Sequence, residues 1–451
     1  MKKVMMVLAT VMFLVASNRN GLHQQLQRLI KKHDLTAYDP GPVPDPAKVE
    51  LGRMLFFDKI LSGNKDISCA TCHHPGLKSG DELTLSIGVG GEGLGTSRRM
   101  GDGRERIPRN SPEIFNRGAA EWHTMFWDGR VARSTSKGFD TPADEKLPQG
   151  LENVLAAQAM FPVLSRDEMR GEIGDKDILG NENELALISD AVPQSVWYRL
   201  TRRLLDIPEY RTMFQAVYPE IQPEKLGFQH AANAIAAFEA AAFTFTKSPW
   251  DRYLAGDHQA LSPSAMRGAV LFYEKARCVT CHSGNLLTDQ AYHNIGIPQF
   301  GPGKDDAAPL DAGRFMESGL QRDRFAFRTP PLRNVTITGP WMHNGAYNDL
   351  RDVITHHLNA ETALRHYDEQ QLPEELRHTY KGDQDVIERV LDNLDPVIGK
   401  SPKLSENEVS DILAFLEALT DPDALDLTSL MPEAVPSGLP LENISNKENT
   451  Y

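Results

Sequence analysis

Cysteine is scarce in this chain, with four residues among 451. A small scaffold held together by disulfides needs a far higher density of cysteine, so the composition excludes that class. A basic surplus is also missing, because 48 Lys and Arg face 62 Asp and Glu and leave a net charge of −14. Proteins that bind nucleic acid neutralise its phosphates with Lys and Arg, so we expect no nucleic-acid partner.

Long apolar runs are rare as well. The run from Val4 to Ala16 follows Lys2 and Lys3, and it is shorter than the about 20 residues that a membrane-spanning helix needs. A basic start before a short apolar run is typical of a secretory signal. We therefore expect residues 1–17 to be a signal peptide, with an uncleaved anchor as the alternative. The mature chain is expected to lack a membrane span and to be periplasmic.

All four cysteines lie in two strings of one pattern, Cys69-Ala70-Thr71-Cys72-His73 and Cys278-Val279-Thr280-Cys281-His282. Cys-x-x-Cys-His is the attachment signal for haem c, in which two thiols bind the porphyrin and the His binds iron. A structural zinc site usually keeps its cysteine pairs within a few tens of residues, and a redox dithiol needs no adjoining His. The strings therefore predict two covalently bound haem c groups and redox chemistry.

The chain also contains a weak internal repeat. Residues 52–57 (GRMLFF) precede the first string and residues 268–273 (GAVLFY) precede the second. Both end apolar-periodic segments that are typical of helices, so each resembles the first helix of a cytochrome c module. We expect a mostly α fold of two cytochrome c-like haem domains with long loops. The expected boundaries are residues 18–247 for the N-terminal domain, 248–428 for the C-terminal domain and 429–451 for a disordered tail.

Two further helices are expected. Ser405 and Glu408 have the spacing of a capping box and predict a helix over residues 409–419 that closes the second module. The Ala-rich segment 225–246 is also expected to be helical and to pack between the modules.

A candidate iron ligand lies in the segment 349–359. At helical spacing, Leu350, Val353, Ile354 and His357 share one stripe. His357 thus faces a core that contains a haem, where its imidazole is a candidate sixth ligand. The alternative is a core His that is satisfied by hydrogen bonds. His356 lies about 100° round the helix and is the weaker candidate.

The stretch from Phe126 to Arg130 (FWDGR) is followed by Gln158, Pro162 and Glu168. Taken alone, Trp127 is a buried structural residue and Glu168 a surface carboxylate. Beside an open haem, however, a buried carboxylate can act as the acid and base that assists peroxide cleavage.

Together these motifs resemble the bacterial dihaem cytochrome c peroxidase family, which includes MauG. The similarity runs from about Pro44 to Thr420. It rests on the two haem strings and on four further motifs, which are residues 110–112 (NSP), 126–130 (FWDGR), 329–334 (TPPLRN) and 340–345 (PWMHNG).

The resemblance implies roles for single residues. The N-terminal haem is the peroxide site and His73 its proximal ligand, whereas the C-terminal haem passes electrons. Trp127 matches the residue between the haems, Gln158 and Glu168 match the distal pair, and Pro162 stands where MauG-like members have Pro. Asn110, with the carbonyl groups of Thr338 and Pro340, matches an interdomain calcium site. Oxygen ligands of this kind suit calcium, and a hydrogen-bond cluster without metal is the alternative.

Two positions depart from the family. Typical peroxidases carry a distal His after Ser-Ile-Gly, where this chain has Val89, so the first haem is expected to be open. At the position of His357, peroxidases have Met and MauG has Tyr. The resemblance therefore predicts that His282 and His357 together bind the second iron, with a lower potential than a Met ligand gives.

The function that follows is the reduction of hydrogen peroxide to water. A small external protein, a cytochrome c or a cupredoxin, supplies electrons that pass from the C-terminal haem to the N-terminal one. The alternative is MauG-like oxidation of side chains of a partner protein through high-valent haem iron. A third hypothesis, an electron carrier without enzymatic activity, leaves the open iron and the acidic distal residue unused.

Overall fold

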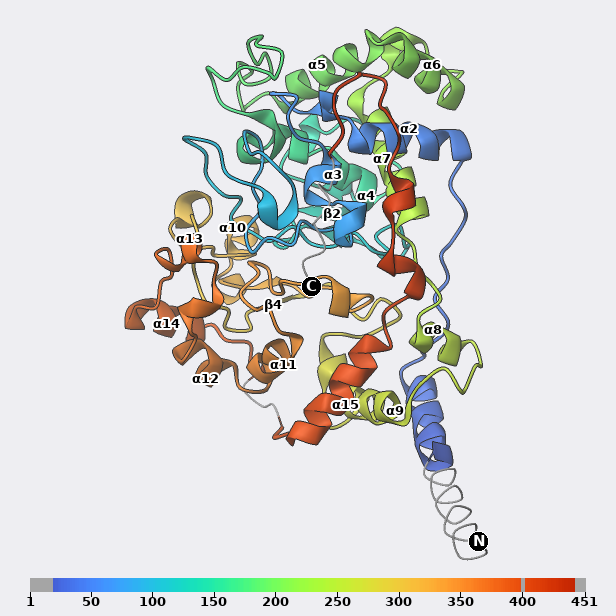
Figure 1. Cartoon of the computed structure of the whole chain (residues 1–451), viewed down its shortest axis with the longest axis vertical. Coiled ribbons are helices and arrows are strands. Elements are labelled where there is room, and N and C mark those ends of the chain that lie inside the picture. Colours follow the sequence, from blue (N-terminus) through green and yellow to red (C-terminus); the bar gives the residue numbers. More distant parts are fainter. Residues whose placement is uncertain (1–18, 399–401, 443–451) are drawn as a thin grey trace, which may run out of the picture.

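The computed structural model describes residues 19–398 and 402–442. The chain is mostly α-helical, as expected, and forms two lobes that lie one above the other in Figure 1. The expected signal peptide, residues 1–17, lies outside the described residues.

The N-terminal lobe contains a core helix pair, three further helices and the first haem string. Its helices are α2 (Pro46–Phe57), α3 (Cys69–Cys72), α4 (Val154–Ala159), α5 (Pro193–Leu205), α6 (Pro208–Val217) and α7 (Phe228–Ala242). Three short antiparallel strands, β1 (Thr124–Met125), β2 (Val131–Ser134) and β3 (Gly138–Asp140), pair in the order β1-β2-β3.

The C-terminal lobe also contains a helix pair and a haem string. Its helices are α8 (Pro249–Leu254), α9 (Pro263–Tyr273), α10 (Phe315–Ser318), α11 (Leu350–Leu358), α12 (Ala360–Arg365), α13 (Glu374–Arg377), α14 (Gln384–Leu391) and α15 (Glu406–Glu417). Strands β4 (Tyr292–His293) and β5 (Phe327–Arg328) pair antiparallel. The predicted capping box is confirmed, because the Ser405 N–H donates to Glu408 Oε2 at 2.8 Å and the Ser405 side chain accepts from the Glu408 N–H.

The internal repeat has a structural cause. A Cβ added to Gly52 on α2 would overlap the carbonyl of Ala234 on α7. A Cβ added to Gly268 on α9 would overlap the carbonyl of Asp411 on α15 in the same way. Each glycine therefore lets two helices cross at backbone contact. The segment expected to pack between the modules is instead, as α7, the partner of α2 inside the N-terminal lobe.

The two ends of the described part of the chain, which begins at residue 19 and ends at residue 442, are exchanged between the lobes. Residues 19–32 form a helix whose Leu26 and Leu29 are buried in the C-terminal core, although the sequence assigned them to the N-terminal domain. Figure 1 shows this helix at the foot of the molecule, beside α8 and α9.

The C-terminal segment runs the other way, up the side of the N-terminal lobe (Figure 1). Val435 is buried in that core, and the Ser437 hydroxyl donates to Asp58 Oδ1 at 2.6 Å. Glu442 accepts the hydroxyl proton of Thr71 at 2.8 Å, within the first haem string, and pairs with Lys59 at 3.1 Å. The expectation of a disordered tail is therefore corrected for residues 429–442, which pack against and hydrogen-bond to a distant part of the chain.

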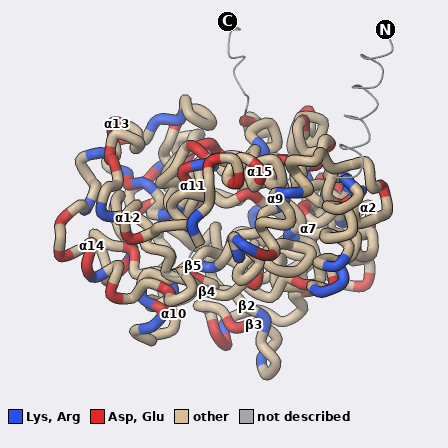
Figure 2. The backbone as a smooth tube through the Cα atoms, turned by 90° about the horizontal axis from the view of Figure 1, so that it is seen from below, with Lys and Arg blue, Asp and Glu red and all other residues tan. Residues whose placement is uncertain are grey.

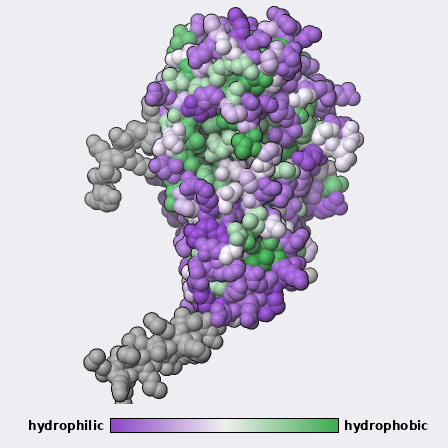
Figure 3. Space-filling view, turned by 90° about the vertical axis from the view of Figure 1, so that its right-hand side faces the viewer, coloured by the Kyte–Doolittle hydropathy of each residue, from purple (hydrophilic) through white to green (hydrophobic). Residues whose placement is uncertain are grey.

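Charge and hydropathy are mixed over the surface. In Figure 2, Lys and Arg alternate with Asp and Glu around both lobes. On the face shown in Figure 3, hydrophobic patches are interrupted by hydrophilic side chains. Among the described residues, no helix is both long and apolar enough to cross a membrane.

Candidate haem sites

The first haem string borders a cavity of about 520 Å³, which lies within the range of ligand pockets. Cys69, Cys72 and His73 line it together with Trp127, and so do the three other residues expected at the reaction site, Gln158, Pro162 and Glu168. Burial raises the pKa of the Cys69 thiol to about 12 and lowers the pKa of His73 to about 4. His73 is therefore neutral at pH 7, the form that binds a metal.

The orientation of His73 is set by a backbone carbonyl and a side-chain hydroxyl. Its Nδ1 lies 3.3 Å from the carbonyl of Ser79 and 3.3 Å from the hydroxyl of Ser111. Because a carbonyl only accepts, Nδ1 carries the proton and Nε2 is left as the metal-binding atom. A metal-binding His usually donates its other N–H in this way.

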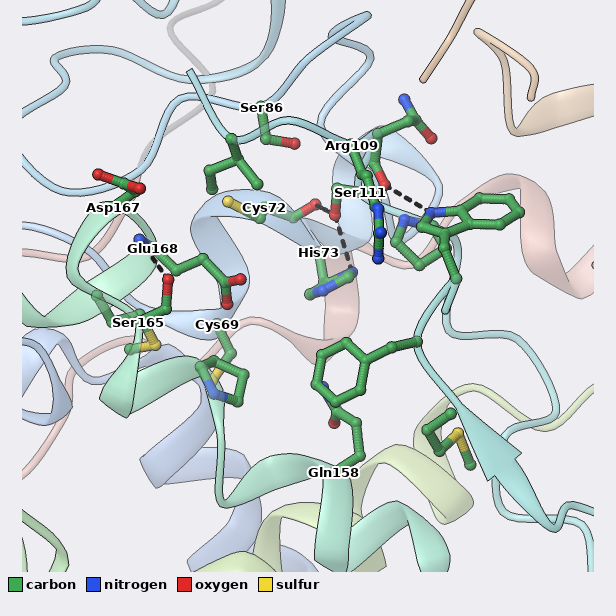
Figure 4. A pocket seen from close by; sticks show the side chains of 18 of the residues that line it. Cys69, Cys72, His73, Ser86, Arg109, Ser111, Gln158, Ser165, Asp167 and Glu168 are labelled. Atoms are coloured by element: carbon green, nitrogen blue, oxygen red, sulfur yellow. Dashed lines mark hydrogen bonds between the residues drawn. The ribbon is translucent and has the colours of Figure 1, made fainter. Parts of the chain in front are cut away.

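Two elements aim polar groups at His73. Gln158 projects from α4, whose N-cap Asn153 accepts the Ala156 N–H. Glu168 lies in a short π-helical turn, Arg166–Arg170, where the Ser165 hydroxyl accepts the Glu168 N–H at 3.3 Å. Figure 4 shows the Glu168 carboxyl directed into the space in front of His73, with Gln158 entering from the α4 side. Pro162 is the first residue of the 3₁₀ turn that joins these two elements.

The electrostatics of Glu168 involve two cations that the sequence analysis did not assign. Burial raises the pKa of Glu168, and Arg130 and Lys304 oppose this effect. The Arg130 guanidinium lies 4.0 Å from the Glu168 carboxylate and also pairs with the buried Asp128 at 2.9 Å. Lys304 belongs to the C-terminal lobe, so both lobes contribute to this cavity. The FWDGR motif was the available signal for Arg130, whereas Lys304 had none.

Val89 is buried at the back of the Glu168 turn. Its N–H lies 3.0 Å from the Glu168 carbonyl and 3.2 Å from the Asp167 carbonyl. The loop is fixed further by Arg98, whose Nε and Nη2 donate to the carbonyls of Ile87 and Gly88 at 2.8 and 2.7 Å. The segment in which typical family members carry a distal His is thus tied by its backbone to the turn that bears Glu168.

The second haem string borders a cavity of about 210 Å³, which is lined by Cys278, Cys281, His282 and His357. Burial raises the pKa of the Cys278 thiol to about 12 and lowers the pKa of His282 to about 4. His282 Nδ1 lies 3.1 Å from the Leu287 carbonyl, and His357 Nδ1 lies 2.8 Å from the Val353 carbonyl. By the argument used for His73, the proton of each ring lies on Nδ1, so Nε2 is the atom whose lone pair suits a metal.

Other histidines near this cavity have partners of another kind. His356 is buried, with Nε2 2.7 Å from the Ile295 carbonyl and Nδ1 2.8 Å from the Tyr347 hydroxyl, so it is a satisfied core His. His293 lies between Asp289 and Asp395, and the hydrogen bond to Asp289 is the largest of the effects that raise its pKa to about 11. His343 stacks on Phe327 with ring centroids 3.4 Å apart.

Trp127 and Arg328 line both cavities. The Trp127 indole donates to the Asn110 carbonyl at 3.0 Å, which fixes the ring between the two lobes. The Asn110 N–H donates to the His343 carbonyl at 2.8 Å, and its side-chain amide donates to the Leu83 carbonyl at 2.7 Å. Thr338 and Pro340 lie in the loop before His343 and line neither cavity.

The donor set fits haem. Each cavity joins two thiols and the His that follows them, whose Nδ1 faces a backbone carbonyl. The Nη1 of Arg117, which lines the first cavity, is buried and finds no hydrogen-bond acceptor among the described residues. A carboxylate on the bound group would satisfy it, and porphyrin propionates are such carboxylates. The available sequence signal for Arg117 was its i, i+4 spacing from Glu113, with which it forms an ion pair.

Known proteins share these features. The family profile of di-haem cytochrome c peroxidases matches residues 46–259. MauG of Methylorubrum extorquens is 30% identical over 85% of this chain and 82% of its own length. The cytochrome c551 peroxidase of Pseudomonas aeruginosa is 30% identical over 85% of this chain and 88% of its own length.

Two solved structures share the fold. The crystal structure of a MauG-like protein associated with microbial copper homeostasis superposes with a TM-score of 0.59 and 27% identity, over 88% of this chain and 96% of that one. The diheme peroxidase BthA of Burkholderia thailandensis gives 0.57 and 22% identity, over 91% and 94%, and supports the fold alone. Two haem strings on two cavities, with full-length relatives of this kind, show that the chain belongs to the di-haem cytochrome c peroxidase family and carries two covalently bound haem c groups.

Proposed function

We propose that this protein reduces hydrogen peroxide to water in the cavity of His73. The observation that carries the proposal is the convergence of Glu168 and Gln158 on the space in front of His73. When bound there, haem iron would accept the peroxide and cleave its O–O bond. The residues of the chain must then supply proton transfer, orientation and a path for electrons.

Glu168 is suited to move the proton. As a carboxylate it accepts a proton from the peroxide oxygen nearest to His73, and as the acid it returns that proton to the far oxygen, which leaves as water. Gln158 carries an amide that both donates and accepts, so it can orient the peroxide without changing its own charge. The overall reaction consumes two electrons and two protons for each peroxide and yields two waters.

The electrons are proposed to come from a small external redox protein, a cytochrome c or a cupredoxin. They enter at the second haem, held by His282 and His357, and cross to the first cavity through Trp127, which borders both. An indole fixed by its hydrogen bond to Asn110 keeps one orientation between the two sites.

Glu168→Gln tests the proposal. We expect the reaction of the diferric protein with stoichiometric peroxide, followed in the Soret band, to slow by about 10²–10⁴-fold, the usual contribution of general acid–base catalysis. Glu172→Gln is the matched control, because Glu172 lies four residues away with its side chain 53% exposed. Equal rates in both variants would contradict the role of Glu168.

The second candidate function is MauG-like oxidation of side chains of a partner protein. It is favoured by Val89 and His357, which replace the ligands of typical peroxidases. Steady turnover with a reduced small cytochrome supports peroxide reduction. A protein that reacts with peroxide but does not turn over with any small cytochrome or cupredoxin supports the oxidation of a partner.

We further propose that the protein is exported by its N-terminal signal and acts in the periplasm. The support is the pattern of residues 1–17 together with covalent haem, which is attached outside the cytoplasm. Mass spectrometry of protein from the periplasmic fraction tests this, with a mature N-terminus near residue 17 as the expected result.

Calcium between the lobes is the remaining proposal. Its support is that Asn110 already joins the lobes through His343, while Thr338 and Pro340 lie in the same loop as His343. Metal analysis of protein purified without chelator is expected to find calcium. Asn110→Ala should abolish calcium binding. If the unaltered protein contains no calcium, the site is a hydrogen-bond cluster without metal.

A further inference from the structure

We propose that a chain of aromatic side chains carries oxidising equivalents from the second haem cavity to the buried Tyr253, whose partner His23 is half-buried beside the exposed His258. The inference rests on the proposed function, because peroxide is the oxidant. It concerns residues that the peroxide reaction itself does not use.

The chain begins on α9 at the wall of the cavity. Phe272 lines the cavity, and its neighbour Tyr273 lies with the ring centroid 5.2 Å from that of Phe272. Trp250 on α8 stacks on Tyr273 with centroids 6.1 Å apart and planes inclined by 26°. All three rings are buried in the C-terminal core.

The chain continues to the surface along α8. Tyr253 stacks on Trp250 with centroids 6.0 Å apart and planes only 7° from parallel. The Tyr253 hydroxyl lies 2.8 Å from Nδ1 of His23, a half-buried residue of the N-terminal helix. The His23 ring in turn lies 4.4 Å from that of His258, which is exposed. Neighbouring rings with centroids 4.4–6.1 Å apart thus connect the cavity wall with the exposed His258.

Proton acceptors decide where an oxidising equivalent stops. A tyrosine that loses an electron becomes a strong acid, so it is a stable site only where a base can take its proton. The buried hydroxyl of Tyr273 has no hydrogen-bond partner among the described residues. Tyr253 has His23, and burial lowers the pKa of His23, so the ring is neutral and able to accept at pH 7. Gln27 also hydrogen-bonds the Tyr253 hydroxyl; its amide can donate to the oxygen and leave the phenolic proton for His23.

The step is balanced as follows. Peroxide takes two electrons and, with two protons, yields two waters. In protein that holds one added electron, that electron is the first and Tyr253 supplies the second. The phenolic proton of Tyr253 moves to His23 Nδ1, which leaves a neutral tyrosyl radical beside an imidazolium. A small reductant in solution that reaches the exposed His258, whose ring lies 4.4 Å from that of His23, then supplies the electron, and His23 returns the proton to Tyr253. An unused equivalent thus leaves without damage to the cavity.

The experiment uses the full-length holoprotein, reduced by one electron and mixed with one equivalent of hydrogen peroxide. Electron paramagnetic resonance of rapidly frozen samples is expected to show a tyrosyl radical. Tyr253→Phe should lose the signal, and Trp250→Phe should lose it too, while the Soret change keeps its rate. Tyr210→Phe is the control, because Tyr210 is buried in the other lobe and donates to Asp58, and it should keep the signal.

A second measurement needs no variant. In protein that contains ring-deuterated tyrosine, the hyperfine splitting of the radical signal should narrow, which assigns the radical to a tyrosine. A normal Soret reaction with no radical, with a signal that ring deuteration leaves unchanged, or with a signal that Tyr253→Phe retains, overturns the relay and leaves the proposed function intact. Absence of any Soret reaction overturns the proposed function and the relay together.

Discussion

Arg130 provides the sharpest test of the distal electrostatics. Its guanidinium lies 4.0 Å from the Glu168 carboxylate, and the two side chains are 19% and 24% exposed. At that separation two unit charges interact by about 4 kcal/mol in an effective dielectric constant of 20. Since one pKa unit corresponds to about 1.4 kcal/mol, the upper bound for the effect of Arg130 on Glu168 is about 3 units.

Arg130→Gln should therefore raise the pKa of Glu168. Burial already raises that pKa, and Arg130 is the largest opposing influence, so its removal adds to the effect of burial. The proton transfer needs the carboxylate, which is lost below the pKa. We expect the acid limb of the peroxide reaction to move to higher pH by about 1–2 units, less than the bound because solvent reaches both side chains.

The assay is the rate of the Soret change after mixing with peroxide, measured as a function of pH in stopped flow. The variant should fold, because Asp128 keeps its second partner, Arg109. Arg133→Gln is the control, since Arg133 lies on β2 and binds the carbonyls of Ala120 and Trp122 at its surface. An acid limb at unchanged pH in Arg130→Gln, or an equal shift in Arg133→Gln, would refute the reasoning.

Three further predictions concern the second haem and the packing. His357→Met should raise the potential of the second haem within the range of about 0.8 V that axial ligands set, as measured by spectroelectrochemical titration; an unchanged low-spin spectrum would argue against His357 as a ligand. Gly268→Ala should destabilise the protein by about 1–3 kcal/mol, because its Cβ meets the Asp411 carbonyl; denaturant unfolding measures this, and a neutral effect would mean that the helices can separate. Glu442→Gln should cost about 1 kcal/mol, because a charged acceptor for Thr71 is lost; differential scanning calorimetry at pH 7 checks it against Glu433→Gln.

Motifs with local causes were predictable from the sequence. Examples are the two haem strings, the capping box at Ser405 and the helix that carries His357. Each depends on the spacing of residues a few positions apart, and this spacing does not depend on the tertiary structure. The preference for His357 over His356 followed from helical periodicity alone, and ligation by His357 stays a prediction. In the structure, His356 is satisfied by Ile295 and Tyr347, while His357 lines the cavity.

Contacts between distant segments were not predictable. The pattern of residues 225–246 predicted a helix, but nothing in it identified α2 as the partner of α7. Lys304 reaches the first cavity from the other lobe, and no local pattern marks it. The missing periodicity of residues 429–442 suggested disorder, because an irregular segment that is buried on another lobe has no repeating apolar face.

By itself the sequence determined the chemistry available to this protein: two sites for covalent haem, the His that adjoins each pair of thiols, and the helices that hold them. Only the tertiary structure decided how Glu168, Arg130 and Lys304 meet over one cavity, how Trp127 borders both, and how each end of the chain packs on the opposite lobe. The physical reason is that thiol and imidazole spacing is fixed by the covalent chain. The field at a buried carboxylate, in contrast, depends on charges that folding brings together from far along the sequence.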